Sequence, residues 1–421
     1  MNLSTIASLA NIALTAALAA YGAAIIALTA ALFFGAKANG AGADDSNHGG
    51  DGSRDDDNGG KLPGVSVVIP FRNEERNLGA LLASLDKQVY GGMIEVILVN
   101  DQSEDNWVNI INAFCQSNSR ISIKIMDLQP SADTRLTSKQ QALDLGVAAS
   151  SHPLIALTDA DMILAPNWIK SLTDSQISTN AALVFGHTSI INTAKNTGVD
   201  KDTDTDNNAH IGINAATAGN KKSLFALLES YQLEFLFAFA YAFSKLGLTG
   251  SCMGNNALVT KEGYLKCGGQ RGIGYSIVED RALLELMRRR GLKTAASEPF
   301  FVTAETYPSR SKTQFANQTL RWAAGGLRPG GGLFAAGLLL LAQNTLFPLS
   351  IAGIMPAAAA ATCAANFLLT WAFLAIAFRK NNSPASKLLF PLYYLFMLAE
   401  TVIFAVAMVF RPKIKWKDRK L

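Results

Sequence analysis

Cysteine and histidine are scarce in this chain of 421 residues, which contains four of each. The cysteines, Cys115, Cys252, Cys267 and Cys363, show no C-x-x-C spacing, and no histidine lies near them at the spacing of a metal site. The sequence therefore contains no zinc motif. Isolated cysteines of this kind indicate reduced residues, which suits a cytosolic domain.

A strong excess of one charge is also lacking, since 37 Lys and Arg against 33 Asp and Glu leave a net charge of +4 at pH 7. The basic residues gather around residues 288–290 and in a basic tail, residues 411–421. A basic stretch beside an apolar segment is typical of a membrane flank. We therefore expect a membrane partner and no nucleic acid.

The two common glycine-rich phosphate loops are missing as well. The turn after the first predicted strand reads Pro70-Phe71-Arg72-Asn73-Glu74, without the G-x-G-x-x-G of a Rossmann dehydrogenase, and no Walker-A loop follows any strand. Phosphates of a bound nucleotide must therefore be held by other groups.

Long apolar runs are abundant: 49% of the residues are apolar and the mean hydropathy is +0.19. Residues 3–34 carry no charge, which is enough for a helix to cross about 30 Å of hydrocarbon, so we expect a retained transmembrane anchor over residues 1–34. The uncharged run 330–378 is long enough for two spans broken near Pro348 or Pro356. We predict C-terminal membrane helices over residues 331–410.

The last apolar segment, residues 388–410, contains Pro391 and Glu400, so it is compatible with a span, an interfacial helix or a re-entrant segment. If all three C-terminal segments crossed and residues 63–330 were cytosolic, the basic tail would end outside, against the preference of Lys and Arg for the cytoplasmic side. We therefore predict that this segment does not cross fully. The expected protein is multi-pass in the inner (plasma) membrane, with a cytosolic catalytic domain.

Two polar tracts and one interrupted apolar stretch complete the organisation. Residues 35–62 are rich in Gly, Asn and Asp and predict a flexible linker, because they lack the spacing of an EF-hand loop. A similar tract at about residues 192–220 predicts a disordered surface insertion. Residues 222–248 are apolar but interrupted by Glu234 and Lys245, which favours an interfacial or packed helix over a span.

Strand and helix patterns alternate within residues 63–330. The predicted strands are residues 65–69 (stopped by Pro70), 94–99, 122–126 and 154–158, and the predicted helices are residues 77–85, 107–114 and 139–149. This alternation predicts an α/β domain with a mostly parallel sheet and helices on both faces.

Carboxylates follow two of these strands directly. Asp101 comes after the run 96–100, and Asp159-Ala160-Asp161 comes after the run 154–158. In open α/β sheets ligands bind at the carboxyl ends of the strands. Glu279-Asp280 then opens a predicted helix, and Gln318-Thr319-Leu320-Arg321-Trp322 follows. Together these groups suit a nucleotide diphosphate held through a divalent cation.

This ordered set resembles the membrane-bound family 2 glycosyltransferases with a GT-A fold, which include cellulose and hyaluronan synthases and ceramide glucosyltransferase. The resemblance covers about residues 63–325. It implies that the donor is bound by the residues that match the family's first loop, its nucleotide element, its lysine-bearing helix and its D-x-D motif: Pro70, Arg72, Glu74, Asp101, Lys139 and Asp159.

The same resemblance implies the catalytic groups. Asp159 and Asp161 match the D-x-D motif that binds Mg²⁺ or Mn²⁺, Glu279-Asp280 the pair that supplies the base, and Gln318, Arg321 and Trp322 the Q-x-x-R-W motif of the acceptor and diphosphate region. Two positions depart from the family. Asn100 replaces the first Asp of the nucleotide element, and Val278 precedes Glu279 where processive synthases usually have Thr, which disfavours polymerisation.

The chemistry agrees with these roles. A cation held by Asp161 stabilises charge that develops on the departing diphosphate, and Asp280 takes the proton of the attacking hydroxyl. The helix dipole at Asp280 favours the anion and keeps its pKa low unless burial raises it. Arg321 suits a charge-assisted bond to the diphosphate, and Trp322 an apolar wall.

Each motif alone has a plainer interpretation. Asp159-x-Asp161 also suits a turn, Glu279-Asp280 a helix cap, and the Q-x-x-R-W residues the polar face of a helix. Lys139 also suits a solvated surface position, and Asn255-Asn256 either a turn or an acceptor wall. The ordered set outweighs these separate readings.

We therefore expect an inverting glycosyltransferase that moves a sugar from a nucleotide-sugar donor, by family default a UDP-sugar, to a lipid-linked or membrane-proximal acceptor. Such a reaction belongs to glycolipid or cell-envelope polysaccharide synthesis. The alternatives are a processive polysaccharide synthase and a non-catalytic nucleotide-sugar-binding membrane protein.

Overall fold

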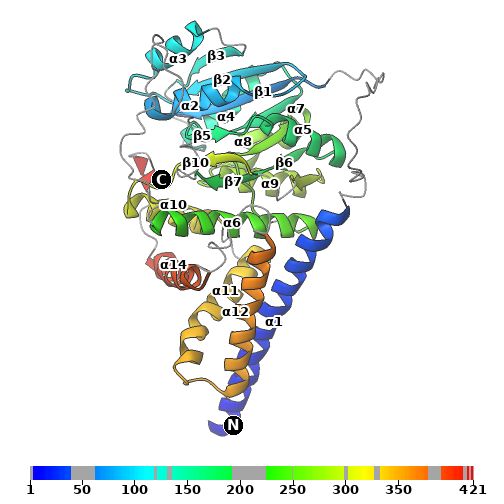
Figure 1. Cartoon of the computed structure of the whole chain (residues 1–421), viewed down its shortest axis with the longest axis vertical. Coiled ribbons are helices and arrows are strands. Elements are labelled where there is room, and N and C mark those ends of the chain that lie inside the picture. Colours follow the sequence, from blue (N-terminus) through cyan, green and yellow to red (C-terminus); the bar gives the residue numbers. More distant parts are fainter. Residues whose placement is uncertain are drawn as a thin grey trace, which may run out of the picture.

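The computed structural model describes residues 3–38, 62–117, 121–129, 135–191, 224–248, 250–297, 302–326, 332–377, 390–410, 415–416 and 419–420. An α/β domain lies above a group of long apolar helices, and helix α6 lies between them (Figure 1). The prediction that residues 35–38 begin the linker is wrong, because they belong to helix α1 (Leu3–Ala38), and Ala and Lys favour a helix. Linker residues 39–61 and the predicted insertion at residues 192–220 fall outside the described residues, as does most of the basic tail.

The strands are β1 (Val65–Phe71), β2 (Ile94–Asn100), β3 (Ser122–Asp127), β4 (Leu154–Leu157), β5 (Met162–Leu164), β6 (Leu183–Phe185), β7 (His187–Ile190), β8 (Ala257–Thr260), β9 (Thr294–Ala296), β10 (Val302–Thr306), β11 (Lys415–Trp416) and β12 (Arg419–Lys420). The helices are α1 (Leu3–Ala38), α2 (Glu75–Asp86), α3 (Trp107–Gln116), α4 (Ser138–Ala149), α5 (Trp168–Thr179), α6 (Leu224–Lys245), α7 (Lys261–Cys267), α8 (Gly269–Ile273), α9 (Glu279–Arg289), α10 (Lys312–Gly326), α11 (Gly332–Ile351), α12 (Ala357–Ala377) and α14 (Phe390–Phe410).

The main sheet has the strand order β3-β2-β1-β4-β8-β6-β9. Strands β3, β2, β1 and β4 are parallel to one another, and only β8 runs antiparallel to its neighbours β4 and β6. A smaller sheet, β5-β10-β7, lies beside it. The expected α/β domain with a mostly parallel sheet is therefore confirmed.

Both faces of the sheet are covered, which explains the continuous apolar runs of its central strands. One core packs β1 and β2 side chains against α2, α3 and α5, and the other packs the opposite side chains against α4, α6 and α9. The second core continues without a break into α1, α12 and α14. The sheet and the apolar helices therefore share one hydrophobic core rather than forming two separate bodies.

The predicted end of the first strand at Pro70 is wrong, because β1 continues through Pro70 to Phe71. Proline cannot donate a backbone hydrogen bond. No donor is needed at Pro70, because pairing with β4 ends before it: Thr158 donates to the Val68 carbonyl at the end of that ladder. On the β2 side, the Phe71 carbonyl accepts a hydrogen bond from the backbone N–H of Asp101. Pro70 thus sits where the β4 side of the strand is open.

Three of the apolar helices run side by side away from the domain. Helices α1, α11 and α12 lie nearly parallel in the view of Figure 1, and α11 and α12 form an antiparallel pair. Helix α11 continues through Pro348, and the chain turns at residues 352–356, so the break lies at Pro356. Among the described residues, four helices are long and apolar enough to cross a membrane: these three and α6.

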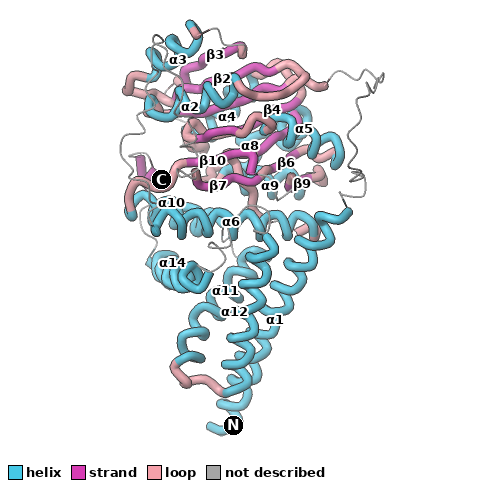
Figure 2. Tube along the Cα trace, in the orientation of Figure 1, coloured by secondary structure: helices cyan, strands magenta, loops and turns pink. Residues whose placement is uncertain are grey.

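Helix α6 lies across the other apolar helices, directly beneath the sheet (Figure 2). It buries an aromatic face, and Phe225 packs on Phe315 of α10 while Phe239 packs on Phe373 of α12. Its carboxylate Glu234 is buried beside His187 of β7, with 2.9 Å between Oε2 and Nε2. These contacts agree with the predicted packed helix.

Helix α14 also differs in direction from the parallel group, since Figure 1 shows it along its own axis. The C-terminal pair β11 and β12 lies beside α10, on the same side as the α/β domain. The two C-terminal strands thus lie on the domain side, and whether the last apolar segment crosses the membrane stays a prediction.

Polar side chains fix the parallel helices against each other. Asn366 of α12 donates to the Leu18 carbonyl of α1 and to Oε1 of Gln343 in α11, both at 2.9 Å. Gln343 in turn donates to the hydroxyl of Tyr394 in α14. Hydrogen bonds between helices are favoured in lipid, where polar groups find no water. The network holds α14 against the bundle.

Candidate active site

One cavity of about 1870 Å³ is lined by all the residues that the sequence predicted for catalysis, donor binding and metal binding. Its lining includes the donor-side, acidic and C-terminal motif residues Pro70, Arg72, Glu74, Asp101, Lys139, Asp159, Asp161, Glu279, Asp280, Gln318, Arg321 and Trp322. Pro70 lies at the end of β1, and the loops that follow β1, β2 and β4 carry Arg72, Glu74, Asp101, Asp159 and Asp161. Helices α4, α9 and α10 carry the other residues. Residues more than 250 positions apart in the sequence thus meet at the carboxyl edge of the sheet.

The loops after β1 and β2 hold each other at one end of the cavity. Arg72 donates from Nη1 to the Asp101 carbonyl at 3.0 Å, and the Asn73 backbone N–H donates to the Ser103 hydroxyl at 3.0 Å. Asn73 has a left-handed backbone, with φ 53°, which Asn tolerates better than most residues. Asp101 is buried at this junction. The two loops therefore present a fixed, polar surface.

Asn100, the residue that departs from the family pattern, has a clear structural partner. Its Nδ2 donates to Oδ1 of Asp127 at 2.8 Å, and its Oδ1 accepts from the Ser103 backbone at 2.9 Å. An Asp at this position would place two carboxylates in contact and lose the donor. The Asn is therefore matched to the Asp at the end of β3.

Lys139 joins the two acidic motifs. Its Nζ lies 2.8 Å from Oδ1 of Asp159 and 2.8 Å from Oε1 of Glu279. Burial disfavours the ammonium, but the two carboxylates outweigh it and hold the pKa of Lys139 above its usual value. Its position at the start of α4 is set by the Thr137 and Gln140 capping box. Lys139 is therefore a fixed bridge and not a solvated surface lysine.

Asp280 opens helix α9 with both carboxylate oxygens engaged. Oδ2 accepts from the Gly254 backbone N–H at 2.9 Å, and Oδ1 accepts from the Arg281 backbone N–H at 2.7 Å. A Cβ on Gly254 would lie 2.5 Å from the Cβ of Asp280, so only glycine allows this approach. Burial, followed by the charge of Glu279, raises the pKa of Asp280 to about 6. Burial thus outweighs the helix dipole, and a pKa near neutrality suits a general base.

The D-x-D carboxylates, Asp159 and Asp161, lie on the turn between β4 and β5 and are partly exposed to the cavity. Among the described residues no group of three His, Cys, Asp or Glu side chains could hold a metal ion by itself. Magnesium is commonly bound by one or two carboxylates together with phosphates of the substrate. The two hard oxygen donors in an open cavity fit such a shared site, and the metal stays a prediction.

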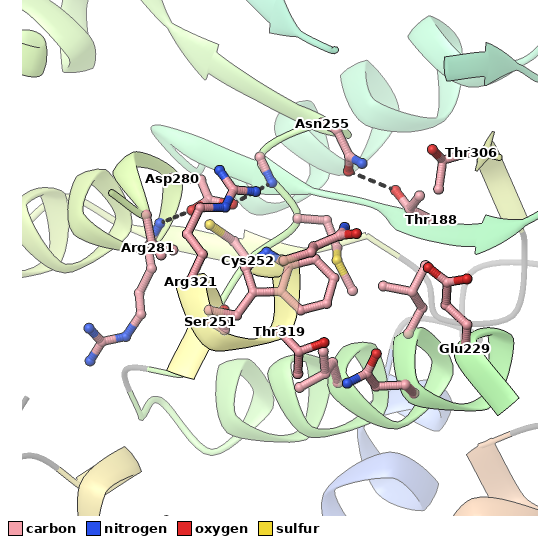
Figure 3. A pocket seen from close by; sticks show the side chains of 18 of the residues that line it. Thr188, Glu229, Ser251, Cys252, Asn255, Asp280, Arg281, Thr306, Thr319 and Arg321 are labelled. Carbon is pink, nitrogen blue, oxygen red and sulfur yellow. Dashed lines mark hydrogen bonds between the residues drawn. The ribbon is translucent and has the colours of Figure 1, made fainter. Parts of the chain in front are cut away.

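Helix α10 brings the Q-x-x-R-W residues to the cavity wall, while Thr319 on the same helix is buried. The charge of Arg321 acts on Lys139, which indicates that the two cations lie close together. Figure 3 shows Arg321 on the same side of the cavity as Asp280 and Cys252. This face of α10 therefore lies against the cavity and not against bulk solvent.

The two asparagines left open by the sequence have separate roles. Asn255 lines the cavity and accepts from the Thr188 hydroxyl at 3.1 Å (Figure 3). Asn256 is fully buried, where it donates to the His187 carbonyl and accepts from the Trp168 indole. Asn255 belongs to the wall and Asn256 to the core.

Several lining residues were not identified from the sequence. Gly254 supplies a backbone donor to Asp280, and no side-chain pattern signals that role. Glu229, Gln232 and Glu400 form a buried polar group on the membrane side of the cavity. The sequence does contain a signal for the two glutamates, because acidic residues inside apolar helices usually face a protein interior.

Comparison with known proteins follows this geometry. Residues 66–262 match the description "Glycosyl transferase family 2", and residues 213–421 match "Glycosyl transferase family 21". Among curated proteins, glycosyltransferase GlyG of Streptococcus pneumoniae is 29% identical over 29% of this chain and 38% of its own length. An N-acetylglucosaminyltransferase of Rhizobium meliloti is 26% identical over 62% of this chain and 55% of its own length. The matched part of the chain thus spans less than two thirds of the length of each of these two relatives.

Among solved structures, the mannosyltransferase PcManGT from Pyrobaculum calidifontis, in complex with GDP-Man and Mn²⁺, has a TM-score of 0.51 at 14% identity. The similarity covers 94% of this chain and 99% of that one. At this identity the similarity shows a shared fold.

Proposed function

The chain belongs to the family 2 glycosyltransferases, with a GT-A domain joined to apolar helices, and on that basis we propose that it is an inverting transferase with a membrane-embedded acceptor. The donor in this proposal is a nucleotide sugar, with a UDP-sugar as the first candidate. One observation carries the proposal: the acidic motifs share a single cavity with residues of the membrane-side helices α1, α11 and α14.

The donor end is the loop pair after β1 and β2. Buried Asp101 suits the uridine part of a donor, and Arg72 fixes the loop that carries Asp101 by donating to its carbonyl. Pro70 and Glu74 line the same end. Arg321 suits the diphosphate, because guanidinium groups bind phosphate oxygens through two parallel hydrogen bonds.

Asp161, with Asp159, would hold the Mg²⁺ or Mn²⁺. When bound, such a cation stabilises negative charge on the departing diphosphate. Lys139 holds Asp159 and Glu279 in fixed positions on the two sides of the reacting region. The two ion pairs of Lys139 thereby connect the D-x-D motif, which would hold the metal, to the Glu279-Asp280 pair, which would supply the base.

Asp280 is the proposed general base. Its two backbone donors fix the carboxylate, and its pKa of about 6 leaves it mostly ionised at pH 7 but still a useful proton acceptor. The proton of the acceptor hydroxyl passes to Asp280 as the oxygen attacks the anomeric carbon. Attack from the side opposite the diphosphate inverts the configuration at that carbon.

A membrane acceptor is supported by the apolar part of the cavity wall. Leu28 of α1, Phe239 of α6 and Leu340 of α11 line the same space as Asp280. Apolar walls of this kind suit a lipid chain better than a free sugar. A single transfer to a lipid is therefore favoured over a processive polymer, which agrees with Val278 in place of the usual Thr.

A screen of donors tests this function. The purified protein in detergent, with Mg²⁺ or Mn²⁺, is incubated with UDP-, GDP- and TDP-sugars, and nucleotide release is measured. We expect release from at least one donor, abolished in Asp280→Asn when a lipid extract supplies the acceptor. Binding of a donor without release under any condition would favour the non-catalytic alternative.

The proposed location is the inner membrane with the domain in the cytosol. The C-terminal strands β11 and β12 lie beside α10, on the same side as the α/β domain, which supports a tail on the cytosolic side together with that domain. Single cysteines near Ser103, Asn381 and Lys420, in a cysteine-free background, test it with a membrane-impermeant thiol reagent. We expect no labelling of the three sites in intact cells, and labelling of the Ser103 site from outside would refute the cytosolic domain.

A further inference from the structure

The membrane end of the cavity carries a polar group that the proposed transfer does not use. Glu229 and Gln232 of α6 and Glu400 of α14 line the cavity at this end, with exposed fractions of 5%, 6% and 8%. Buried charged groups in apolar helices are costly and usually mark a site. Figure 3 shows Glu229 across the cavity from Asp280, beside Thr188 and Thr306.

Gln232 is held in one orientation by its neighbour. Its Nε2 donates to Oε1 of Glu400 at 2.8 Å. In this pair the amide nitrogen of Gln232 faces Glu400, and its carbonyl oxygen is left for another donor. That oxygen, Oε1, is buried and has no hydrogen-bond partner within the part of the chain that the structure describes. A buried acceptor without a partner is unfavourable, which points to a donor supplied by a ligand.

Glu229 fixes the neighbouring loop and contributes charge. Its two oxygens accept from the Ser309 backbone at 2.9 Å and from the Ser309 hydroxyl at 2.6 Å. Burial, followed by the charge of Glu229, raises the pKa of Glu400 to about 8. The surroundings at this end therefore disfavour negative charge, and they would also disfavour a phosphate placed there.

The position of this group relates it to the acceptor. Helix α6, which carries Glu229 and Gln232, lies between the α/β domain and the apolar helices, and it lines the cavity together with Asp280, Arg321 and residues of α1 and α11. A lipid that extends from the residues of α1 and α11 towards Asp280 therefore brings its polar headgroup into the cavity whose wall includes Gln232. There the carbonyl oxygen of Gln232, which is unpartnered within the described residues, can accept a hydrogen bond from the headgroup.

We propose that Gln232 and Glu400 form a headgroup subsite, which accepts a hydrogen bond from a second, uncharged donor group of the acceptor lipid and rejects phosphate. Gln232 is then a residue that determines specificity, distinct from the base Asp280. The inference rests on the proposed transfer to a membrane acceptor. It adds that the acceptor carries a hydrogen-bond donor next to the hydroxyl that reacts.

Three simple lipids of equal chain length test the subsite with the full-length protein in nanodiscs. Dodecan-1-ol offers one hydroxyl, dodecane-1,2-diol offers a second donor, and dodecyl phosphate offers an anion. We expect kcat/KM to be about tenfold higher for the diol than for the alkanol, the effect of one hydrogen bond to a buried group, with the phosphate lowest.

Two variants separate the roles. Gln232→Met keeps the side-chain length but removes the hydrogen-bond acceptor, so kcat/KM for the diol should fall to the value for the alkanol. Glu400→Gln keeps a hydrogen-bonding partner but removes the charge that Glu400 carries above its pKa of about 8, so discrimination against dodecyl phosphate in assays at about pH 9 should weaken. Leu228→Met is the matched control, because Leu228 is a buried residue of α6 that does not line the cavity. Its lipid preference should equal that of the wild type.

Binding gives a readout that needs no turnover. Scintillation proximity with tritiated diol should show about tenfold weaker binding to Gln232→Met than to the wild type. Equal use of diol and alkanol by the wild type, or a diol preference that survives both variants, would overturn the subsite. Specific diol binding without transfer from any nucleotide sugar would instead refute the proposed function and leave the subsite standing.

Discussion

Replacement of the proposed base should separate activity from stability. In Asp280→Asn the proton acceptor is lost, and removal of a positioned base typically lowers kcat by about 10²- to 10⁴-fold. Binding of the nucleotide sugar should change little, because Asp280 accepts hydrogen bonds from the backbone N–H groups of Gly254 and Arg281 and makes none with the described loops after β1 and β2. Single-turnover transfer and donor titration measure the two effects separately.

The same change should stabilise the folded protein at neutral pH. The rise of the Asp280 pKa from 3.8 to about 6 means that the folded state disfavours the anion, by about 3 kcal/mol once the group is ionised in both states. Because the carboxylate is partly open to the cavity, and because an amide satisfies only one of its two donors, we expect a net gain of about 1–2 kcal/mol.

The sign of the pH dependence follows from the raised pKa. Below about pH 4 the acid is protonated in both states and the substitution changes nothing. As the pH rises from about 4 to 6, the free energy of unfolding of the wild type falls relative to that of the variant. Above about pH 6 the difference between the two free energies is constant. Thermal unfolding in detergent at several pH values measures it, with the exposed Asp174→Asn as control. A variant that is less stable than the wild type at pH 8, with unchanged turnover, would refute the reasoning.

Three further predictions concern the donor side. Asp161→Asn should abolish transfer and weaken donor binding mainly when Mg²⁺ or Mn²⁺ is present, and full activity in excess EDTA would exclude the metal role. Lys139→Met leaves the buried Glu279 without its partner and should cost about 3–5 kcal/mol of stability, measured by denaturant unfolding. Asn100→Asp places a carboxylate against Asp127 and should raise the donor KM severalfold, whereas an unchanged KM would show that the loop tolerates the repulsion.

Much of the domain could be predicted because its signals are local. The runs before Asp101 and Asp159 are continuous and apolar, as expected for strands buried on both faces, and the structure places both acids directly beyond strand ends. The error at Pro70 arose from a local rule. A proline ends a strand only if the adjacent strand needs a backbone donor at that position. At Pro70 the adjacent strand is β4, whose pairing with β1 has already ended.

The remaining features depend on contacts between distant segments. The bridge through Lys139 needs the start of α4, the end of β4 and the start of α9 to converge, and no spacing in the sequence encodes that. The raised pKa of Asp280 likewise depends on burial by the tertiary fold. The direction of α14 depends on its packing against α6 and α11, because its composition alone is compatible with a span.

The stereochemistry of the product tests the central claim most directly. The protein in nanodiscs is given the donor found in the screen together with a lipid extract, and the anomeric configuration of the lipid-linked product is determined by proton NMR. We predict that the sugar becomes linked to a lipid hydroxyl with a configuration opposite to that in the donor. A product that retains the donor configuration, or a sugar released only to water in the presence of every lipid, would contradict a direct displacement assisted by Asp280.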